Sequence, residues 1–209
     1  MYTKQLLEKY PIISEQIEKK ELEIILQELE KILSLDINGD ICEFGCFVGT
    51  TSLFLQRLLM EYNSNKKLYL YDSFDGLPEK SSQDQSAAGA DFIEGELLAT
   101  KSQLKFNFKK ASLPKPKIKK AWFSDLKDKD LPKEICFAFL DGDFYQSIKD
   151  CLNLIQHKIL KGGIIIVDDY DNPALPGAKK AVDEFLSLNK NYKLEKVTQS
   201  LAVITLLSE

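Results

Sequence analysis

The sequence is poor in arginine, histidine and paired cysteine. Arg57 is the single arginine among 28 basic residues, and there is one histidine. The formal net charge is −4, a balance that does not indicate a nucleic-acid partner. The four cysteines form no C-x-x-C pair, so we expect no zinc site and instead expect reduced, buried thiols.

Long apolar runs are also missing. No run approaches the roughly 18 residues that cross a membrane, so we expect no membrane span. The N-terminus soon becomes charged and lacks the apolar segment of a signal peptide, and we expect a cytoplasmic protein. With 209 residues, 44% of them hydrophobic, the chain can bury a sizeable core, and we assign residues 1–209 to a single domain.

Two apolar runs end abruptly in carboxylates. The carboxylates are Asp141 and Asp143, after residues 137–140, and Asp168 and Asp169, after residues 163–167. Such runs are typical of parallel strands buried on both faces, and a helix is predicted between them. Because ligands bind at the carboxyl edge of open α/β sheets, we predict a divalent cation there. The alternative is that these side chains only solvate strand ends and cap helices.

A strand, a glycine turn and a helix are predicted over residues 40–62. Gly45 and Gly49 permit a tight turn and the close approach of a ligand. The N-terminus of the helix offers free N–H groups to a carboxylate or phosphate. The pattern E-x-G-x-x-x-G departs from the dinucleotide fingerprint G-x-G-x-x-G, which disfavours NAD.

A second strand, residues 66–71, ends at Asp72. An acidic residue at this place grips the ribose of a cofactor, since a carboxylate accepts hydrogen bonds from both hydroxyls. We therefore predict that Asp72 binds a ribose. The alternative is a simple turn residue at the end of the strand.

The segments around these strands are predicted to be helices and a loop. Residues 1–38 form a helical cover, with a helix that starts near Ser14. Residues 79–92 are polar and small, which indicates either a mobile lid over a site or a disordered surface loop. Residues 93–111 are predicted to be a helix.

Three further strands complete the pattern. Residues 118–123 predict a strand that contains Trp122, which either packs in the core or stacks on an adenine. Residues 192–197 and 201–206 predict an antiparallel hairpin. The expected fold class is therefore α/β, with a seven-stranded, mostly parallel, doubly wound sheet and a C-terminal antiparallel hairpin.

Six motifs form a specific combination along the chain. They are E-F-G-x-x-x-G (43–49), Y-D-S-F-D-G-L-P (71–78), A-W-F (121–123), L-D-G-D-x-Y-x-S (140–147), G-G-x-I-I-V-D-D-Y (162–170) and P-G-A-K-K-A-V-D-E-F (176–185). This combination resembles the macrocin-type O-methyltransferase family over roughly residues 38–188. The resemblance implies a Rossmann-like class I methyltransferase fold, S-adenosylmethionine as methyl donor, and a metal ion, with Mg²⁺ expected.

The resemblance also implies a role for each matching position. It makes Asp143 the general base. The implied metal ligands are Asp141, Asp168 and Asp169. The implied contacts of the methyl donor are Glu43, Phe44, Gly45, Gly49, Thr51, Ser52, Asp72, Ser73, Trp122 and Asp141. The chain departs from the family at Val48, where members often carry arginine, and at Ala121, where they usually carry glycine.

The expected activity is Mg²⁺-dependent transfer of a methyl group to a sugar hydroxyl of a glycan, nucleotide sugar or glycosylated metabolite. Two other functions stay open: methylation of a catechol-like phenol, which also chelates a metal through two oxygens, and nucleotide binding without methyl transfer. The expected partner is a small-molecule or glycan substrate, and the family resemblance adds a homodimer as a candidate assembly.

Overall fold

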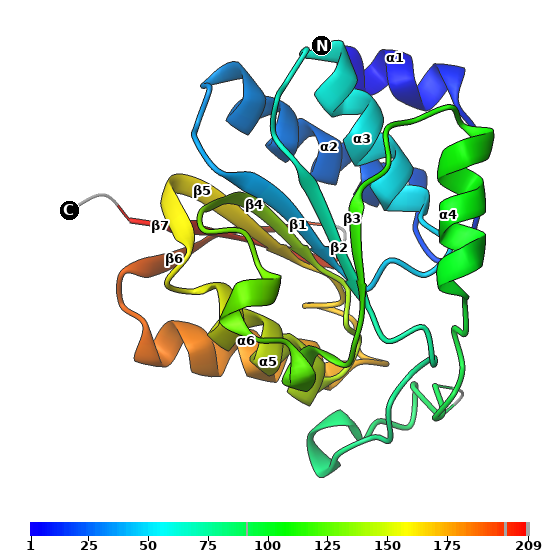
Figure 1. The fold of residues 1–209 in the computed structure, drawn as a ribbon. Coiled ribbons are helices and arrows are strands. Elements are labelled where there is room, and N and C mark those ends of the chain that lie inside the picture. Colours follow the sequence, from blue (N-terminus) through cyan, green and yellow to red (C-terminus); the bar gives the residue numbers. More distant parts are fainter. Residues whose placement is uncertain (91, 199, 208–209) are drawn as a thin grey trace.

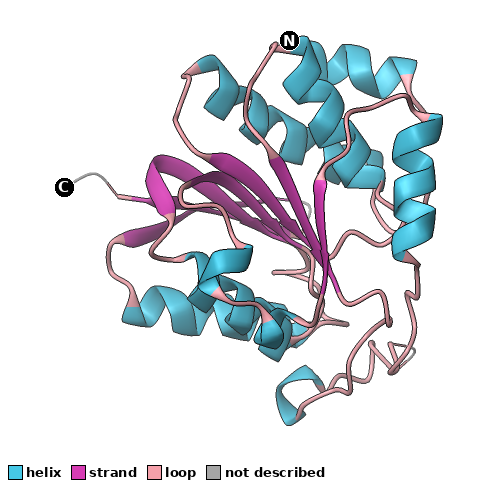
Figure 2. Cartoon of the chain, in the orientation of Figure 1, coloured by secondary structure: helices cyan, strands magenta, loops and turns pink. Residues whose placement is uncertain are grey.

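The computed structural model describes residues 1–90, 92–198 and 200–207, and its centre is a seven-stranded sheet (Figure 1, Figure 2). The strands are β1 (Asp40–Phe44), β2 (Leu68–Asp72), β3 (Lys117–Lys120), β4 (Ile135–Leu140), β5 (Ile159–Val167), β6 (Tyr192–Thr198) and β7 (Leu201–Leu206). Their order is β3-β2-β1-β4-β5-β7-β6. The first five strands pair in parallel, whereas β7 pairs antiparallel with β5 and β6. The predicted fold class is confirmed.

Helices cover both faces of the sheet (Figure 1). The helices are α1 (Tyr2–Lys9), α2 (Lys19–Ser34) and α3 (Thr50–Glu61) on one face, α5 (Tyr145–Ile155) and α6 (Pro176–Leu188) on the other, and α4 (Lys101–Lys110) beside the β3 edge. β1 and β4 are neighbours in the sheet, but the helices that follow them, α3 and α5, cover opposite faces. This is the switch point at which open α/β sheets bind ligands.

Strand β4 explains why the central sequence is continuously apolar. All six of its residues are buried. Phe137 and Phe139 pack into the core that contains α1, α2 and α3, whereas Ala138 and Leu140 pack into the core that contains α5 and α6. Because side chains alternate between the two faces, a strand covered on both faces needs an apolar residue at every position.

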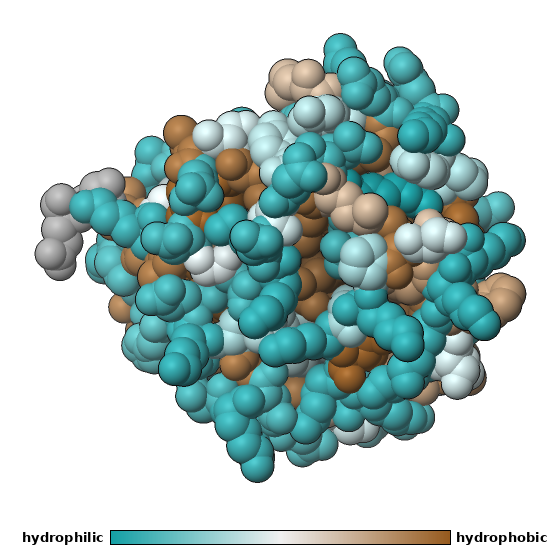
Figure 3. Space-filling view, turned by 45° about the horizontal axis from the view of Figure 1, so that its top comes forward, coloured by the Kyte–Doolittle hydropathy of each residue, from teal (hydrophilic) through white to brown (hydrophobic). Residues whose placement is uncertain are grey.

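The surface is mainly hydrophilic on the face that Figure 3 shows. All four cysteines are free and buried, as predicted. In the part of the chain that the structure describes, no helix combines the length and the apolar character that a membrane span requires.

The N-terminal region is helical, but its second helix begins later than predicted. α2 starts at Lys19 rather than near Ser14, because Glu18 is its N-cap. The Glu18 backbone N–H donates to the Glu21 side chain at 2.9 Å and closes a capping box. The hydroxyl of Ser14 instead lies 2.8 Å from that of Thr50, at the start of α3.

The helix predicted for residues 93–111 is wrong in its first part. Only α4 is helical in this region. Gly95 and Leu97 have φ values of 83° and 55°, which a right-handed helix excludes. Thr100 then caps α4, since its hydroxyl oxygen accepts the N–H of Gln103 at 3.1 Å.

Strand β3 is shorter than the predicted strand over residues 118–123. It ends at Lys120, and Trp122 lies beyond it as the residue before a short 3₁₀ turn, Phe123–Asp125. Trp122 is 37% exposed, so of the two alternatives the core position is excluded, and stacking on an adenine stays a prediction. Its position leaves the indole at the carboxyl edge of the sheet.

Candidate functional site

The ends of β1 and β4 approach each other so closely that only glycine fits between them. The Asp141 N–H donates to the Phe44 carbonyl at 2.8 Å, and the Gly45 N–H donates to the Tyr71 carbonyl at 2.9 Å. A Cβ atom on Gly45 would lie 1.8 Å from the Asp141 carbonyl oxygen, and the φ of Gly45 is +86°. The glycine turn after β1 therefore places Asp141 at the switch point.

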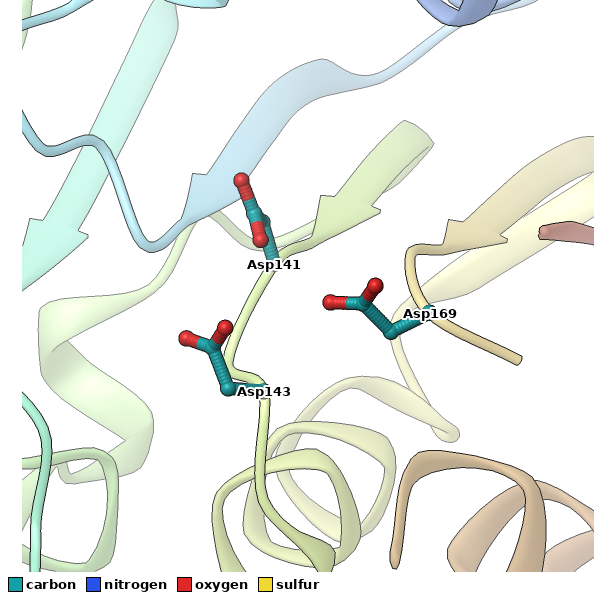
Figure 4. Close-up of side chains that lie close together, drawn as sticks. All are labelled: Asp141, Asp143 and Asp169. Carbon is teal, nitrogen blue, oxygen red and sulfur yellow. The ribbon is translucent and has the colours of Figure 1, made fainter. Parts of the chain in front are cut away.

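Three carboxylates meet at this point. One oxygen each of Asp141, Asp143 and Asp169 lies within 4.8 Å of the others. Figure 4 shows the three side chains around a common space, on the segments that follow β4 and β5. Asp143 and Asp169 have φ values of 58° and 57°, in the left-handed region that non-glycine residues rarely adopt. Backbone strain of this kind concentrates at functional sites, where the surrounding structure holds it in place.

Asp168 lies at the edge of this cluster. Its side chain is buried, and its Oδ1 accepts the N–H of Asp169 at 2.9 Å. Among the neighbouring charges, Asp168 contributes most to raising the pKa of Asp141. The structure thus brings together all four carboxylates that the sequence singled out, with Asp143 rather than Asp168 in the tightest group.

Burial and mutual repulsion disfavour the charged forms of these carboxylates. Desolvation, followed by the charges of Asp169 and Asp72, raises the pKa of Asp143 to about 8. Desolvation is also the largest cause that raises the pKa of Asp141, Asp168 and Asp169. Among the described residues that line the cavity, there is no lysine, arginine or histidine. A bound cation would relieve this repulsion, and hard divalent cations prefer carboxylate oxygens.

The cavity over these carboxylates has a volume of about 260 Å³ and opens to solvent. Five of the predicted contacts of the methyl donor line it: Gly45, Asp72, Ser73, Trp122 and Asp141. The other five, which are Glu43, Phe44, Gly49, Thr51 and Ser52, do not line it. The predicted contacts of the methyl donor therefore form two groups: five residues in the cavity wall and five residues in a layer behind it.

Glu43 and Phe44 belong to the layer behind the wall. Ser52 donates a 2.5 Å hydrogen bond to Oε2 of Glu43, and desolvation raises the pKa of this carboxyl group to about 8. The Phe44 ring stacks on Tyr71 at 4.6 Å and is fully buried. Glu43 joins β1 to the first turn of α3, and Phe44 belongs to the core.

Gly49 and Thr51 form the start of α3. Gly49 is the N-cap with a φ of +91°, and a Cβ there would meet Leu104 of α4 at 2.3 Å. Thr51 is buried in the first turn. Gly49 therefore allows α4 to pack closely against the start of α3.

Asp72 holds the glycine turn in place. Its Oδ2 accepts the N–H groups of Cys46 and Phe47 at 2.7 and 2.9 Å, and its Oδ1 accepts that of Phe74 at 2.7 Å. Phe47 and Phe74 have positive φ values of 46° and 51°. Asp72 therefore stabilises both turns and also faces the cavity, and its contact with a ribose stays a prediction.

Sequence reasoning missed several residues of the cavity wall. These are Glu15, Gln16, Glu21, Phe47, Leu77, Phe92, Leu97, Asn172 and Leu175. Asn172 lies in the turn after β5, where Asp171-Asn172-Pro173 indicates a turn but gives no sign of a contact with Asp169. Glu21 comes from α2, which the sequence marks as a cover and not as part of a site.

Comparison with known proteins identifies the family of this chain. Residues 9–203 match the model of the macrocin O-methyltransferase (TylF) family. The chain belongs to the macrocin O-methyltransferase family. The resemblance drawn from the sequence motifs is confirmed, and the match includes all four carboxylates of the site.

Curated relatives of this family member are named as O-methyltransferases. Two are 27% identical to it, and each match covers 79% of this chain and 65% of the relative. They are 8-demethyl-8-(2,3-dimethoxy-alpha-L-rhamnosyl)-tetracenomycin-C 4'-O-methyltransferase of Streptomyces olivaceus and demethyldecarbamoylnovobiocin O-methyltransferase of Streptomyces niveus. The chain thus spans about two thirds of their length.

Solved structures share the fold. The O-methyltransferase NovP superposes with a TM-score of 0.79 at 25% identity, over 92% of this chain and 81% of NovP. The calicheamicin methyltransferase CalS11 superposes with a TM-score of 0.73 at 19% identity, over 99% of this chain and 90% of CalS11. The Rossmann-like class I methyltransferase fold predicted from the sequence is confirmed.

Proposed function

We propose that this protein is an S-adenosylmethionine-dependent O-methyltransferase that acts on a sugar hydroxyl with the help of a divalent metal ion. The observation that carries the proposal is the group of three carboxylates within 4.8 Å at the β1/β4 switch point of a macrocin-family fold. Carboxylates that converge without a basic residue fit a site for a cation, whereas strand-end solvation alone would leave them apart.

We assign the methyl donor to the part of the cavity wall that the turns after β1 and β2 form. When bound, S-adenosylmethionine supplies an electrophilic methyl group on a sulfonium. We assign the ribose to Asp72, whose two oxygens already accept three N–H groups and retain further acceptor capacity. Gly45 allows the ligand to approach the backbone, and we assign Ser73 and Trp122, which line the same cavity, to the adenosine. Glu43 and Ser52 act from behind, by holding the turn.

The donor set fits a hard divalent ion such as Mg²⁺. Octahedral Mg²⁺ places its oxygen ligands about 2.0–2.1 Å away, hence at most about 4.2 Å apart, slightly closer than the 4.8 Å limit of the cluster. We assign the ion to Asp141 and Asp169 of this cluster and, as the family resemblance implies, to Asp168 at its edge. When bound, the ion acidifies and orients an acceptor hydroxyl.

Asp143 is the proposed general base. It belongs to the same group of oxygens as Asp141 and Asp169, so it lies within reach of a hydroxyl held at the metal site. Its pKa is raised to about 8 by burial and by the neighbouring carboxylates. A positive charge at the site favours the ionised form of Asp143, which then accepts the hydroxyl proton as the methyl group is transferred.

The relatives support a sugar as the acceptor. The name of the tetracenomycin relative specifies a substrate that carries a rhamnosyl group. Another relative, mycinamicin III 3''-O-methyltransferase of Micromonospora griseorubida, is 25% identical over 85% of this chain and 72% of its own length. A sugar offers vicinal hydroxyls, which suit a metal site. The four buried free cysteines agree with a reducing, cytoplasmic location. No nucleic-acid partner is proposed.

Binding and transfer experiments test the proposal together. Calorimetry with S-adenosylhomocysteine should give a binding isotherm, and a panel of glycosides and catechols incubated with labelled S-adenosylmethionine and Mg²⁺ should give a labelled glycoside. EDTA should abolish the product and added Mg²⁺ restore it. An absence of S-adenosylhomocysteine binding would reject the proposal. Labelled catechols without labelled glycosides would reject the sugar acceptor alone.

A further inference from the structure

The polar segment of residues 79–90 packs against the catalytic edge through a buried carboxylate. Asp84 is 1% exposed, although it lies in a segment whose neighbours are small and polar. The segment extends below the carboxyl edge of the sheet (Figure 1). Two further hydrogen bonds hold this segment in place: Ser86 donates to the Pro173 carbonyl at 2.6 Å, and Lys180 donates to Gln83.

Asp84 bonds to the start of α5. Its Oδ1 accepts the backbone N–H of Tyr145, the first residue of that helix, at 2.6 Å. Its Oδ2 accepts the N–H and the hydroxyl of Ser81 at 3.0 and 2.5 Å. A carboxylate at a helix N-terminus is favourable, and burial strengthens the bond. Tyr145 is only two residues from Asp143, so this bond acts directly on the turn that carries the proposed base.

The same carboxylate fills the space between α5 and α6. A Cβ on Gly177, in the first turn of α6, would lie 1.8 Å from Oδ1 of Asp84 and 2.7 Å from the Tyr145 nitrogen. Glycine at this position therefore lets α6 approach Asp84 and the start of α5. The segment that leads into α6 begins at Asp169. Asp84 thus contacts the first turns of the two helices that follow the carboxylates, α5 at Tyr145 and α6 at Gly177.

The turn at Asp143 needs outside support. Its φ of 58° is unfavourable for a residue with a side chain, and the Phe144 N–H bends back to the Gly142 carbonyl at 2.6 Å. A strained turn persists when its surroundings over-determine it. The bond from Tyr145 to Asp84 joins this turn to a segment about 60 residues earlier in the chain.

We propose that Asp84 is a positioning residue, which holds the strained turn of Asp143 and the start of α6 in the arrangement that brings the carboxylates together. This inference rests on the proposed function for its consequence in catalysis. Asp84 itself is not assigned to the metal or to the methyl donor. If its role were only to anchor residues 79–90, its loss would loosen that segment and leave the carboxylates in place.

The test uses Asp84→Ala and, to keep the size and part of the hydrogen bonding, Asp84→Asn. Ser86→Ala is the matched control, because it removes a bond of the same segment to Pro173 without touching α5. Hydrogen exchange of the peptide that contains residues 142–148 should rise at least about 10-fold in Asp84→Ala and stay unchanged in Ser86→Ala. The affinity for Mn²⁺ should fall about 10-fold, as for other groups that support metal ligands.

Turnover provides the second readout. The kcat of Asp84→Ala should fall 10-fold or more, while its affinity for S-adenosylhomocysteine stays within about 2-fold of the wild type. The kcat of Asp84→Asn should lie between those of the wild type and Asp84→Ala. Unchanged exchange of residues 142–148 in both Asp84 variants would overturn the inference. Wild-type protein without methyl transfer would instead reject the proposed function, and the exchange measurement would still decide the role of Asp84.

Discussion

Asn172 donates a 2.8 Å hydrogen bond from Nδ2 to Oδ1 of Asp169. The same asparagine accepts the N–H of Ala174 at 3.0 Å through its own Oδ1, so its orientation is fixed from both ends. The bond to Asn172 opposes the desolvation that raises the pKa of Asp169. Asn172 therefore favours the ionised, correctly turned form of a proposed metal ligand.

Replacement of Asn172 by alanine should weaken metal binding. Groups that orient metal ligands typically contribute 10–100-fold in affinity, and we expect a loss of at least about 10-fold for Mn²⁺. A Mn²⁺ titration followed by electron paramagnetic resonance measures this affinity. Asn189→Ala is the control, since that side chain donates to the Phe185 carbonyl at the far end of α6. Equal Mn²⁺ affinity in the wild type and Asn172→Ala would remove Asn172 from the site.

Gly45→Ala should destabilise the protein strongly. The new Cβ would lie 1.8 Å from the Asp141 carbonyl, so β1 and β4 must separate in addition to the cost of a positive φ. Gly95→Ala is a matched control, with a φ of +83° and no atom within 4 Å of the new Cβ. The control isolates backbone strain, about 1–2 kcal/mol. Thermal unfolding should show a clearly larger fall in Tm for Gly45→Ala, and equal falls would contradict the steric argument.

Glu43 should make metal-free protein less stable as the pH rises. The pKa of Glu43 is about 8 in the folded state and 4.5 for an unperturbed glutamate. Between these values the folded state retains a proton that the unfolded state has lost. The free energy of unfolding therefore decreases with rising pH, by up to about 1.4 kcal/mol per pH unit for one such group.

The Glu43→Gln variant checks the sign and source of this effect. Glutamine stays neutral and can still bond to Ser52, so the decrease between about pH 5 and 8 should be smaller than in the wild type. The buried aspartates keep part of the slope in both proteins. Urea unfolding in EDTA at several pH values measures it. Parallel curves for the two proteins would show that Glu43 does not titrate in this window.

The sequence predicted the sheet well because its strands obey a local rule. Residues 137–140 and 163–167 are buried on both faces, and this burial demands the apolar runs that end at the carboxylates. The helix over residues 93–111 failed where local chemistry prevailed over apolar spacing. Leu97 has the expected spacing, but Gly95 allows a turn and Thr100 caps the helix later.

The sequence predicted those site residues that belong to recognisable motifs at strand ends, and it missed the others. Asp141, Asp143, Asp168 and Asp169 follow strands, so the sheet edge gathers them. Asp84 carries no such signal, since its meaning depends on Tyr145, which is distant in sequence and adjacent in space. The three N–H groups that Asp72 accepts depend in the same way on the conformation of two turns.

The final prediction separates the roles of Asp143 and Asp168. As the base, Asp143 removes a proton, so Asp143→Asn should bind S-adenosylhomocysteine and Mn²⁺ within about 3-fold of the wild type and lose at least 100-fold in kcat. Asp168→Asn should lose metal affinity by 10-fold or more, because the amide is a weaker ligand for a hard cation. Excess Mg²⁺ should then restore part of its activity, but none of that of Asp143→Asn.

The compact group of Asp141, Asp143 and Asp169 makes the opposite assignment a concrete competitor. Asp168 is not a member of that group, and its Oδ1 accepts the Asp169 N–H. Should Asp143→Asn lose Mn²⁺ binding while Asp168→Asn retains it, then Asp143 is a metal ligand and another group must accept the proton. If the acidic limb of the kcat–pH profile of Asp168→Asn then shifts relative to the wild type, Asp168 affects the group that accepts the proton.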